Sequence, residues 1–582
     1  MRPLFKLIGT LYLAVVLSVQ QGDDVDVDSY VQSETPIAKA GVLANIGPDG
    51  ALSSGAAPGV VIASPSTTNP DYLFTWTRDS SLVFKALIDQ YVSGQDTSLL
   101  GHIENFITAE SIIQQVSNPS GTLTTGGLGE PKFNIDETAF TGPWGRPQRD
   151  GPALRATALI TFANFLLSQN NESFVTQTLW PIIQNDLNYV QDNWNQTTFD
   201  LWEEIDSSSF FTTAVQHRSL REGATLATTL GQTSLASGYT TQAENVLCFL
   251  QSFWNPSGSY ITANTGGGRT GIDANTVLAS IHTFDVNAGC DATTFQPCSD
   301  KALANHLVYV DSFRGIYDIN ADLGPAAGVA TGRYPEDIYQ VGNPWYLATF
   351  ANAEQLYAAL HTWTTVGSIE VTSISQAFFQ QFIPSITPGT YPSSSSTFTS
   401  LTSAIRSYAD EFIAINAQNT PSGGGLSEQY SKADGTPVSA NDLTWSYASA
   451  LTAFQARGGV FSNSWGAQGL TVPSSCVPPS TSENPTVAVT FQVDATTVFG
   501  QNIYLVGSVD ALQNWDTNTA MLMSVENYPI WILTVNVPAS SSIQYKYIIK
   551  DGSGDVTWEA DPNNVLDTPA NGALATHDTF RN

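Results

Sequence analysis

The stretch Ser98-Leu-Leu-Gly-His-Ile-Glu-Asn-Phe-Ile-Thr-Ala-Glu-Ser-Ile-Ile-Gln-Gln-Val116 repeats apolar residues every three or four positions. This spacing places them on one face of an α-helix. Similar stripes run through 153–168, 174–190 and 346–361, and the segments between them are loops rich in Gly, Pro, Ser and aromatic residues. Many helices joined by long polar loops predict a mainly α toroid or bundle over 23–476, with a functional site on one rim.

A different pattern begins at residue 486, where apolar and polar residues alternate with the period of a half-buried β-strand. The preceding segment, 477–485, is too rich in Pro and Ser to continue a helix. We therefore expect a short linker over 477–485 and a small all-β sandwich over 486–582. Further short strands are expected at 502–506, 531–537 and 543–549.

The composition restricts the kinds of partner. Only 13% of the 582 residues are charged, and 52 acidic against 21 basic side chains give a net charge of -31. Such a charge repels phosphate backbones and anionic lipid. We therefore expect no nucleic-acid partner and no membrane partner, and a neutral substrate fits best.

The N-terminus has the pattern of a secretory signal peptide. Arg2 and Lys6 precede an apolar stretch, 7–19, which is too short to span a bilayer. This predicts a signal peptide over 1–22 and a secreted, extracellular protein. Two sequons would accept N-glycans on that route, Asn171-Glu172-Ser173 and Asn195-Gln196-Thr197.

Four cysteines fit an oxidising compartment and allow three pairings. Cys290 and Cys298 are close enough in sequence for a local bond, which leaves Cys248 with Cys476 as a long-range bond. Free buried thiols are the alternative. Zinc binding is disfavoured because no two cysteines have C-x-x-C spacing. No metal and no cofactor are expected.

Two acidic segments, 201–204 and 425–430, indicate acid–base chemistry. A carboxylate beside Trp202, such as Glu203, can be desolvated and kept protonated, as a general acid requires. Glu428 has Ser, Gln and Tyr neighbours that can keep it ionised, as a general base requires. Two such carboxylates suit hydrolysis of a glycosidic bond. The alternative is a helix cap and a solvated loop, without catalytic function.

Three more segments, 71–80, 142–152 and 332–345, are dense in aromatic and polar residues. With the two acidic segments, they make 30–476 resemble the fungal glucoamylases of glycoside hydrolase family 15. The region 486–582 resembles a starch-binding module of carbohydrate-binding family 20. The resemblance implies an (α/α)6 toroid joined to a β-sandwich.

The resemblance also implies roles for single residues. Glu203 would be the general acid, Glu428 the general base, and Glu204 a carboxylate that binds the next sugar. Arg78 and Asp79 resemble the pair that binds the outer hydroxyls of the terminal glucose, although two adjacent charges alone would suggest a surface ion pair. The other implied sugar-binding positions are Tyr72, Trp76, Trp144, Trp202, Arg333, Tyr339, Trp345 and Gln429, the last of which orients the base.

The β-module departs from its relatives in several ways. The linker is short, the cysteine pair common in such modules is missing, and one expected starch-binding face has Phe499 in place of Tyr. Buried core positions are the alternative for its tryptophans, whereas exposed rings would stack on sugar faces. The residues that match starch-binding positions are Trp515, Lys546, Trp558 and Asn563 on one face, and Tyr528 and Trp531 on the other.

The expected function is exo-acting, inverting hydrolysis of terminal α-1,4 and, more slowly, α-1,6 glucosidic bonds of starch and maltooligosaccharides. The product would be β-D-glucose, and the enzyme would be a monomer. Two alternatives stay open. One is an enzyme that prefers another α-glucoside, such as isomaltose-type linkages or trehalose, and the other is a non-catalytic protein that adheres to starch.

Overall fold

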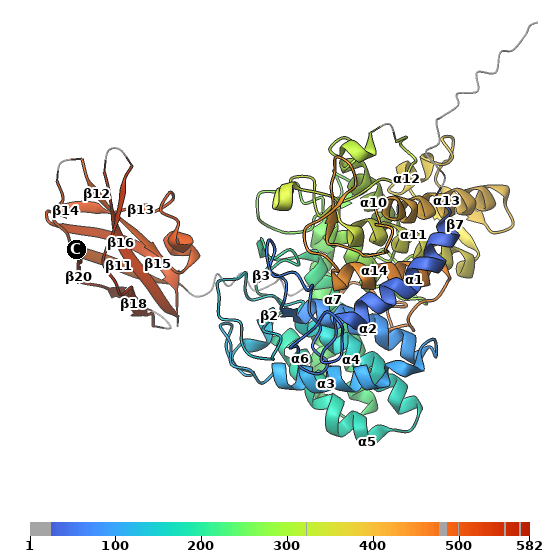
Figure 1. The fold of residues 1–582 in the computed structure, drawn as a ribbon, viewed down its shortest axis with the longest axis horizontal. Coiled ribbons are helices and arrows are strands. Elements are labelled where there is room, and N and C mark those ends of the chain that lie inside the picture. Colours follow the sequence, from blue (N-terminus) through green and yellow to red (C-terminus); the bar gives the residue numbers. More distant parts are fainter. Residues whose placement is uncertain are drawn as a thin grey trace, which may run out of the picture. The chain divides into compact units, whose positions relative to one another are not determined.

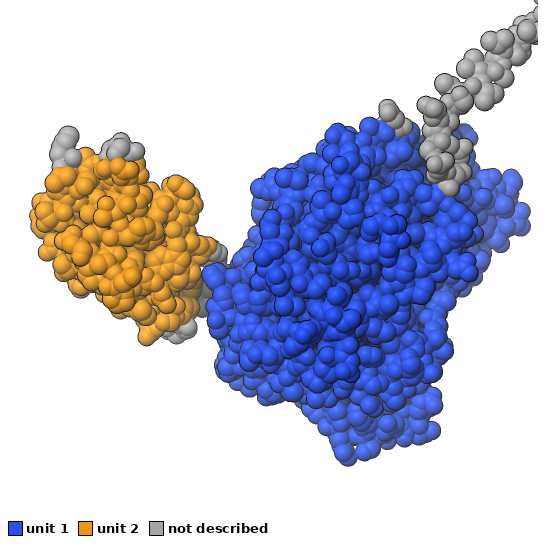
Figure 2. Space-filling model, viewed as in Figure 1, with its two compact units in different colours: residues 1–479 blue, residues 480–582 orange. Residues whose placement is uncertain are grey.

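The computed structural model describes residues 25–321, 323–475, 486–498, 500–539, 541–551, 554–569 and 572–582. The chain divides into two compact units, Met1–Pro479 and Ser480–Asn582 (Figure 2). We call them the helical unit and the β-unit. The predicted signal peptide, 1–22, and the predicted linker, 477–485, lie outside the described residues. None of the described helices is long and apolar enough to cross a membrane.

A closed ring of helices forms the centre of the helical unit. Figure 1 labels several of these helices. Within the described residues, six inner helices contact one another in the order α2, α4, α7, α9, α11, α14 and back to α2. The ring confirms the predicted toroid. The inner helices are α2 (Thr77–Val92), α4 (Gly151–Ser168), α7 (Phe210–Thr229), α9 (Asn275–His282), α11 (Tyr346–Val366) and α14 (Thr444–Arg457).

A second set of helices covers this ring from outside. Each packs on one or two inner helices and buries a single apolar stripe, as Ile103, Phe106 and Ile107 of α3 show. These outer helices are α1 (Val27–Ala44), α3 (Leu100–Ile113), α6 (Trp180–Asn193), α8 (Thr233–Leu250), α10 (Asp300–Ser312) and α13 (Ser396–Gln418). Two short helices, α5 (Glu172–Phe174) and α12 (Gln376–Gln380), lie in the connections.

The inner helices differ from the predicted stripes because they have no solvent face. In α11, sixteen of the 21 residues are buried, including polar Thr349, Asn352 and Gln355. The small residues of α4 and α11, chiefly Ala, let neighbouring backbones approach inside the ring. A helix buried on nearly every side must close against other helices, and the ring satisfies this requirement.

The expected site segments lie next to the N-terminal ends of inner helices. Trp76 immediately precedes α2, Asp150 precedes α4, Trp345 precedes α11, and Glu428 lies in the segment before α14. Short antiparallel strand pairs hold these segments. The pairs are β1 (Thr75–Trp76) with β2 (Lys132–Phe133), β3 (Thr198–Phe199) with β4 (Asp206–Ser207), and β9 (Gln429–Tyr430) with β10 (Pro437–Val438).

The β-unit is a sandwich of two sheets, each with five strands among the described residues. Alternation along β11 turns Val487, Val489, Phe491 and Val493 into the core, as predicted. One sheet has the order β14 (Ser524–Asn527), β15 (Ile530–Pro538), β11 (Thr486–Asp494) and β19 (Ala573–Ala575), with β20 (Asp578–Thr579) also on β11. The other has β13 (Met521–Leu522), β12 (Asn502–Gly507), β16 (Ser542–Lys550) and β17 (Val556–Trp558), with β18 (Asn564–Asp567) also on β16.

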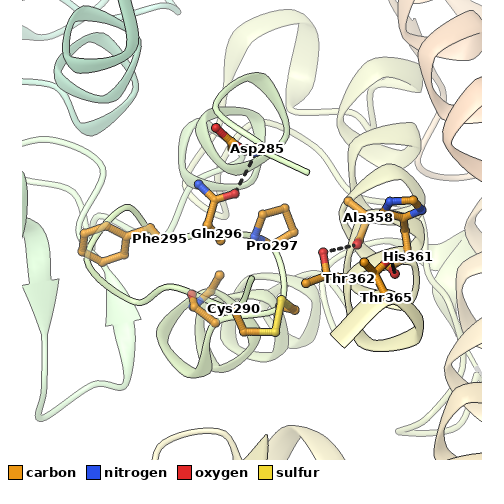
Figure 3. Close-up of a disulfide and its surroundings, with 12 residues drawn as sticks. Asp285, Cys290, Phe295, Gln296, Pro297, Ala358, His361, Thr362 and Thr365 are labelled. Atoms are coloured by element: carbon orange, nitrogen blue, oxygen red, sulfur yellow. Dashed lines mark hydrogen bonds between the residues drawn. A yellow bond between two sulfur atoms is a disulfide. The ribbon is translucent and has the colours of Figure 1, made fainter. Parts of the chain in front are cut away.

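Cys290 and Cys298 form the predicted local disulfide, with their Cα atoms 4.8 Å apart (Figure 3). The bond closes a loop beside Gln296, whose side-chain oxygen accepts from the Asp285 backbone N–H at 2.9 Å. Cys248 is disulfide-bonded as well. Cys476 lies outside the described residues, so the Cys248–Cys476 bond stays a prediction.

We expect non-reducing peptide mapping to join Cys248 to Cys476. Because this bond would close a loop of more than two hundred residues, Cys248→Ser should lower the free energy of unfolding by about 2–5 kcal/mol. Denaturant unfolding measures the loss. Ser252→Ala, a change next to the same helix that removes no cross-link, is the control. A peptide joining Cys476 to Cys290, or an unchanged stability, would contradict this pairing.

Candidate active site

One cavity of about 610 Å³ at this end of the helical ring gathers nearly all the predicted sugar-binding residues. Both expected catalytic carboxylates, Glu203 and Glu428, line it. Gln429 is buried behind the wall, where its side chain bonds Glu428. The predicted residues on the wall are Tyr72, Trp76, Arg78, Asp79, Trp144, Trp202, Glu203, Glu204, Arg333, Tyr339, Trp345 and Glu428.

A tight turn holds Glu203 towards the cavity. Its φ of 66° lies in the left-handed region, which is costly for a residue with a side chain. Asp200 fixes the turn: its carbonyl oxygen accepts from the Glu203 N–H at 2.8 Å, and its buried carboxylate accepts from the backbone N–H groups of Glu204 and Ile205. Asn264 donates to the other oxygen of that carboxylate at 3.0 Å.

The Glu203 carboxylate is surrounded by donors. The indole N–H of Trp76 donates to Oε1 at 2.8 Å, and that of Trp144 donates to Oε2 at 2.9 Å. Gln148 Nε2 and Arg78 Nη2 also donate to Oε1, at 3.0 and 3.3 Å. Both oxygens are therefore fixed in direction, and 18% of the side chain stays exposed to the cavity.

We expected the Trp202 ring to lie beside the Glu203 carboxylate, but it lies elsewhere. The Trp202 indole N–H donates to buried Asp273 at 2.8 Å. Its ring lies 5.5 Å from that of Trp345 and forms another part of the cavity wall. Side chains of adjacent residues diverge in a turn, so Trp76 and Trp144, distant in sequence, take the positions at the carboxylate.

Glu428 was expected in a polar setting that keeps it ionised, with a solvated loop as the non-catalytic alternative, and its deep burial differs from both. The residue is 1% exposed, and burial raises the pKa of its carboxyl to about 7, although hydrogen bonds from Ser439, Tyr72 and Gln429 oppose this rise. Gln429 Nε2 donates at 2.9 Å, and the Ser439 hydroxyl donates to the same oxygen. The Tyr72 hydroxyl is in turn 2.7 Å from that of Tyr339.

Arg78 is the central cation on the Glu203 side of the cavity. It is 4% exposed and bonds Asp150 at 2.8 Å, Gln148 at 2.9 Å and Glu203 at 3.3 Å. Its Nε lies 3.9 Å from an oxygen of Asp79. Burial raises the pKa of Asp79 to about 7 in spite of Arg78. The pair is thus an internal one, and the alternative of a surface ion pair is wrong.

Glu204 points to a second cation cluster. Arg333 Nη2 lies 2.9 Å from Oε1, while Arg269 and the Tyr334 hydroxyl bond Oε2. Burial opposes ionisation of Glu204, but these partners outweigh it and lower its pKa. The Arg333 guanidinium donates two hydrogen bonds to the Asp337 carboxylate, at 2.6 and 2.8 Å, and is therefore held rigidly.

Several side chains at this site were not among the predicted residues. Gln148, Asp150, Tyr334 and Asp337 belong to the aromatic and polar segments noted in the sequence, and that membership was an available signal. Lys132, Arg269 and Ser439 lie outside those segments. Nothing in their local sequence distinguishes them, because only the strand pairs and loops of the fold bring them to the cavity.

The β-unit carries its own pocket of about 490 Å³. Trp515 and Trp558 lie with ring centroids 6.5 Å apart, and Trp558 is 42% exposed. Lys546 is held beneath them by Asp561 at 2.7 Å. All four residues predicted for the first starch-binding face line this pocket, namely Trp515, Lys546, Trp558 and Asn563.

The second expected face is supported less well. Trp531 is 4% exposed, and its indole N–H donates to the Ala495 carbonyl at 3.0 Å, so the ring belongs to the sandwich core. Such a ring cannot stack on a sugar, and we leave Trp531 out of the proposed binding residues. Tyr528 is 56% exposed, whereas Phe499 lies outside the described residues.

Comparisons with known proteins identify the family of the chain. The sequence profile of Glycosyl hydrolases family 15 matches residues 36–455. The chain belongs to that family. It is 60% identical to Glucoamylase-1 of Schizophyllum commune (strain H4-8 / FGSC 9210), over 99% of this chain and all of the relative. The profile of the Starch binding domain matches residues 486–578.

Solved structures of family 15 members share the fold. A glucoamylase from Hypocrea jecorina superposes with a TM-score of 0.76 at 50% identity, covering 96% of this chain and 100% of the other. A glucoamylase from Saccharomycopsis fibuligera gives a TM-score of 0.70 at 30% identity and covers 75% of this chain and 96% of the other.

In this family 15 chain, Arg78→Leu should destabilise the fold more at pH 7 than at pH 4. At pH 7 it leaves buried carboxylates without their cation, which costs about 3–5 kcal/mol. The folded pKa of Asp79 lies above its ordinary value of 3.8, so its contribution to stability falls as pH rises, and loss of Arg78 steepens that fall. At pH 4, below the raised pKa of Asp79, that carboxyl takes up a proton and the loss is smaller.

Thermal unfolding at both pH values measures this difference. Arg406→Leu removes a cation that is 45% exposed and 3.9 Å from Asp410, so it is the control and should cost less than about 1 kcal/mol. An equal loss for Arg78→Leu at pH 4 and pH 7 would show that the carboxylates around it do not depend on its charge.

Proposed function

We propose that this chain is a glucoamylase, an exo-acting hydrolase that releases glucose from the non-reducing ends of starch and maltooligosaccharides. The observation that carries the proposal is the pairing of Glu203 and Glu428 in one aromatic-walled cavity. The names of its family 15 relatives support the same activity. A cavity of about 610 Å³ fits a short segment at the end of a glucan chain.

Glu203 is proposed as the general acid. A proton on this carboxyl passes to the glycosidic oxygen as the bond breaks, and the carboxylate that results needs stabilisation. The indole N–H groups of Trp76 and Trp144, with Arg78, already point at its oxygens. These donors are in place before the negative charge develops, so no reorganisation is required at that moment.

Glu428 is proposed as the general base, which takes a proton from the water that attacks the opposite face of the sugar. A carboxylate with a pKa near 7 is a stronger base than an ordinary one. The bonds from Gln429 and Ser439 hold its direction. Direct attack by water inverts the anomeric centre, so the product would be β-D-glucose.

The remaining wall residues are proposed to bind the sugars. Asp79 and Arg78 would hydrogen-bond the outer hydroxyls of the terminal glucose. Glu204 and Arg333 would bind the next sugar. The aromatic rings offer faces to the C–H groups of the pyranose. These rings are Tyr72, Trp76, Trp144, Trp202, Tyr339 and Trp345.

The β-unit is proposed to hold the enzyme on granular starch. Trp515 and Trp558 present two tilted ring faces at one pocket, with Lys546 and Asn563 beside them to bond hydroxyls. Tethering raises the local concentration of chain ends without a change in the chemistry.

We also propose that the protein is secreted, that it carries N-glycans at Asn171 and Asn195, and that it is a monomer.

Glu203→Gln and Glu428→Gln should each lower kcat on maltose by about 10²–10⁴-fold, because each change removes one acid–base group. Thermal unfolding should move little, since the amides keep shape and volume. Glu104→Gln on the surface of α3 is the control and should leave kcat unchanged.

Assays of released glucose from soluble starch, maltose, trehalose and dextran separate the proposed function from its alternatives. The proposal expects starch and maltose to be hydrolysed most efficiently. Preferred hydrolysis of trehalose or dextran would favour another α-glucosidase. Starch binding without any glucose release would favour an adhesion protein.

Trp515→Ala with Trp558→Ala should remove most binding to granular starch, because each stacked ring carries a large share of a shallow site. Hydrolysis of maltose should stay within about twofold of the parent, since the module acts by tethering. Sedimentation with starch granules measures binding. Val565→Ala, which is exposed and outside the pocket, is the control. Undiminished binding of the double variant would show that these rings do not hold starch.

A further inference from the structure

Lys132 occupies an unusual place beside the cavity. It lies on β2, directly opposite Trp76 of β1, and is only 2% exposed. Four aromatic rings enclose its ammonium group, which we call the Lys132 cage. The distances from Nζ to the ring centroids are 3.6 Å for Trp144, 3.9 Å for Phe74, 4.3 Å for Phe140 and 4.7 Å for Trp76.

Among the residues that the structure describes, no carboxylate neutralises this cation at close range. Among the described residues, Lys132 takes part in no salt bridge, and no hydrogen bond from its ammonium group is found. Burial lowers the pKa of Lys132 to about 8, while Glu203 and Asp71 favour its charged form and Arg146 opposes it. The side chain therefore carries its charge in acidic and neutral solution, where the ring faces stabilise it in place of an anion.

Two rings of the cage are the same rings that bond Glu203. Trp144 donates to Oε2 of that carboxylate and Trp76 donates to Oε1, while Lys132 lies against the ring of each. A cation over an indole face draws electron density from the ring and makes its N–H a stronger donor. The arrangement thus links a positive charge to both oxygens of Glu203 through two indoles.

We propose that Lys132 is a positioning residue that acts on Glu203 through Trp76 and Trp144, and so stabilises the carboxylate formed when Glu203 gives up its proton. The inference rests on the proposed role of Glu203 as general acid. The cage keeps both indoles in fixed orientation and makes them stronger donors when the negative charge develops. A lysine that only filled space could be replaced by an uncharged chain of similar length without this effect.

Lys132→Met tests the proposal, because it keeps the length of the side chain and removes the charge. We expect kcat on maltose to fall about 10-fold, and the descending, alkaline limb of the kcat profile to move to higher pH, because the Glu203 carboxylate is stabilised less. Hydrolysis of α-glucosyl fluoride should fall less than about threefold, since fluoride leaves with little help from an acid. Lys132→Arg should keep the parent pH profile.

Lys85→Met is the matched control. It removes a half-buried lysine of the helical unit, one that pairs with Asp89 at 2.6 Å and does not line the cavity. It should lower thermal stability without shifting the pH profile of kcat. The ratio of kcat on maltose to kcat on α-glucosyl fluoride should also stay that of the parent. If Lys132→Met does not accumulate as folded protein, Lys132→Gln is assayed in the same way.

Each outcome decides between the two interpretations. Equal losses on maltose and α-glucosyl fluoride, an unmoved alkaline limb, or parent-like activity of the Met variant would overturn the proposal. Failure of both uncharged variants to fold would also overturn it and assign Lys132 to the structure alone. If Glu203→Gln kept its activity on maltose, the assignment of Glu203 as general acid would be wrong. That outcome can be told apart from failure of the Lys132 proposal, because it is measured on a different variant.

Discussion

Closure of the six inner helices on one another is the constraint from which the rest of the helical unit follows. Each of these helices is buried on nearly every side, so none is stable without two inner neighbours and an outer cover. Closure brings the segments before α2, α7, α11 and α14 together at one cavity. Residues as distant in sequence as Trp76, Glu203 and Glu428 can therefore act on one bond.

Charge inside that cavity is the second constraint. Buried ions are tolerated only when they are paired and hydrogen-bonded. Arg78 satisfies this condition with Asp150 and Gln148, and Arg333 with Asp337 and Glu204. These fixed pairs allow a neutral sugar to replace water without leaving a bare charge. Lys132 has no paired carboxylate among the described residues, and aromatic faces take the place of its counter-ion.

Much of the fold was predictable because its signals are periodic. The stripe over 98–116 became α3, and the alternation from 486 became β11, since both patterns are set by which faces are buried. The same alternation placed Trp531 on the inward side with Val535 and Val537. Its burial could have been inferred from the strand period, although the family resemblance suggested a binding residue.

The site was predictable as a set of residues but not as a set of contacts. Glu203 and Glu428 stand out because each lies among aromatic, apolar or uncharged neighbours in a chain of which only 13% is charged. The donors on Glu203 could not be inferred, because Trp76, Trp144 and Gln148 reach it only through the closed ring. The hydrogen bonds of Glu428 with Tyr72 and Ser439 could not be inferred either, because these residues lie on other segments. Lys132 has no local signal at all.

The most direct test of the proposed mechanism is the configuration of glucose at the moment of release. A fresh maltose hydrolysate followed by proton NMR should show β-glucose first, and the α-anomer should appear only as mutarotation proceeds. This result requires water activated by Glu428 to attack opposite the bond that Glu203 protonates. Immediate α-glucose would show that a carboxylate attacks the sugar directly, and the proposed roles of the two residues would be wrong.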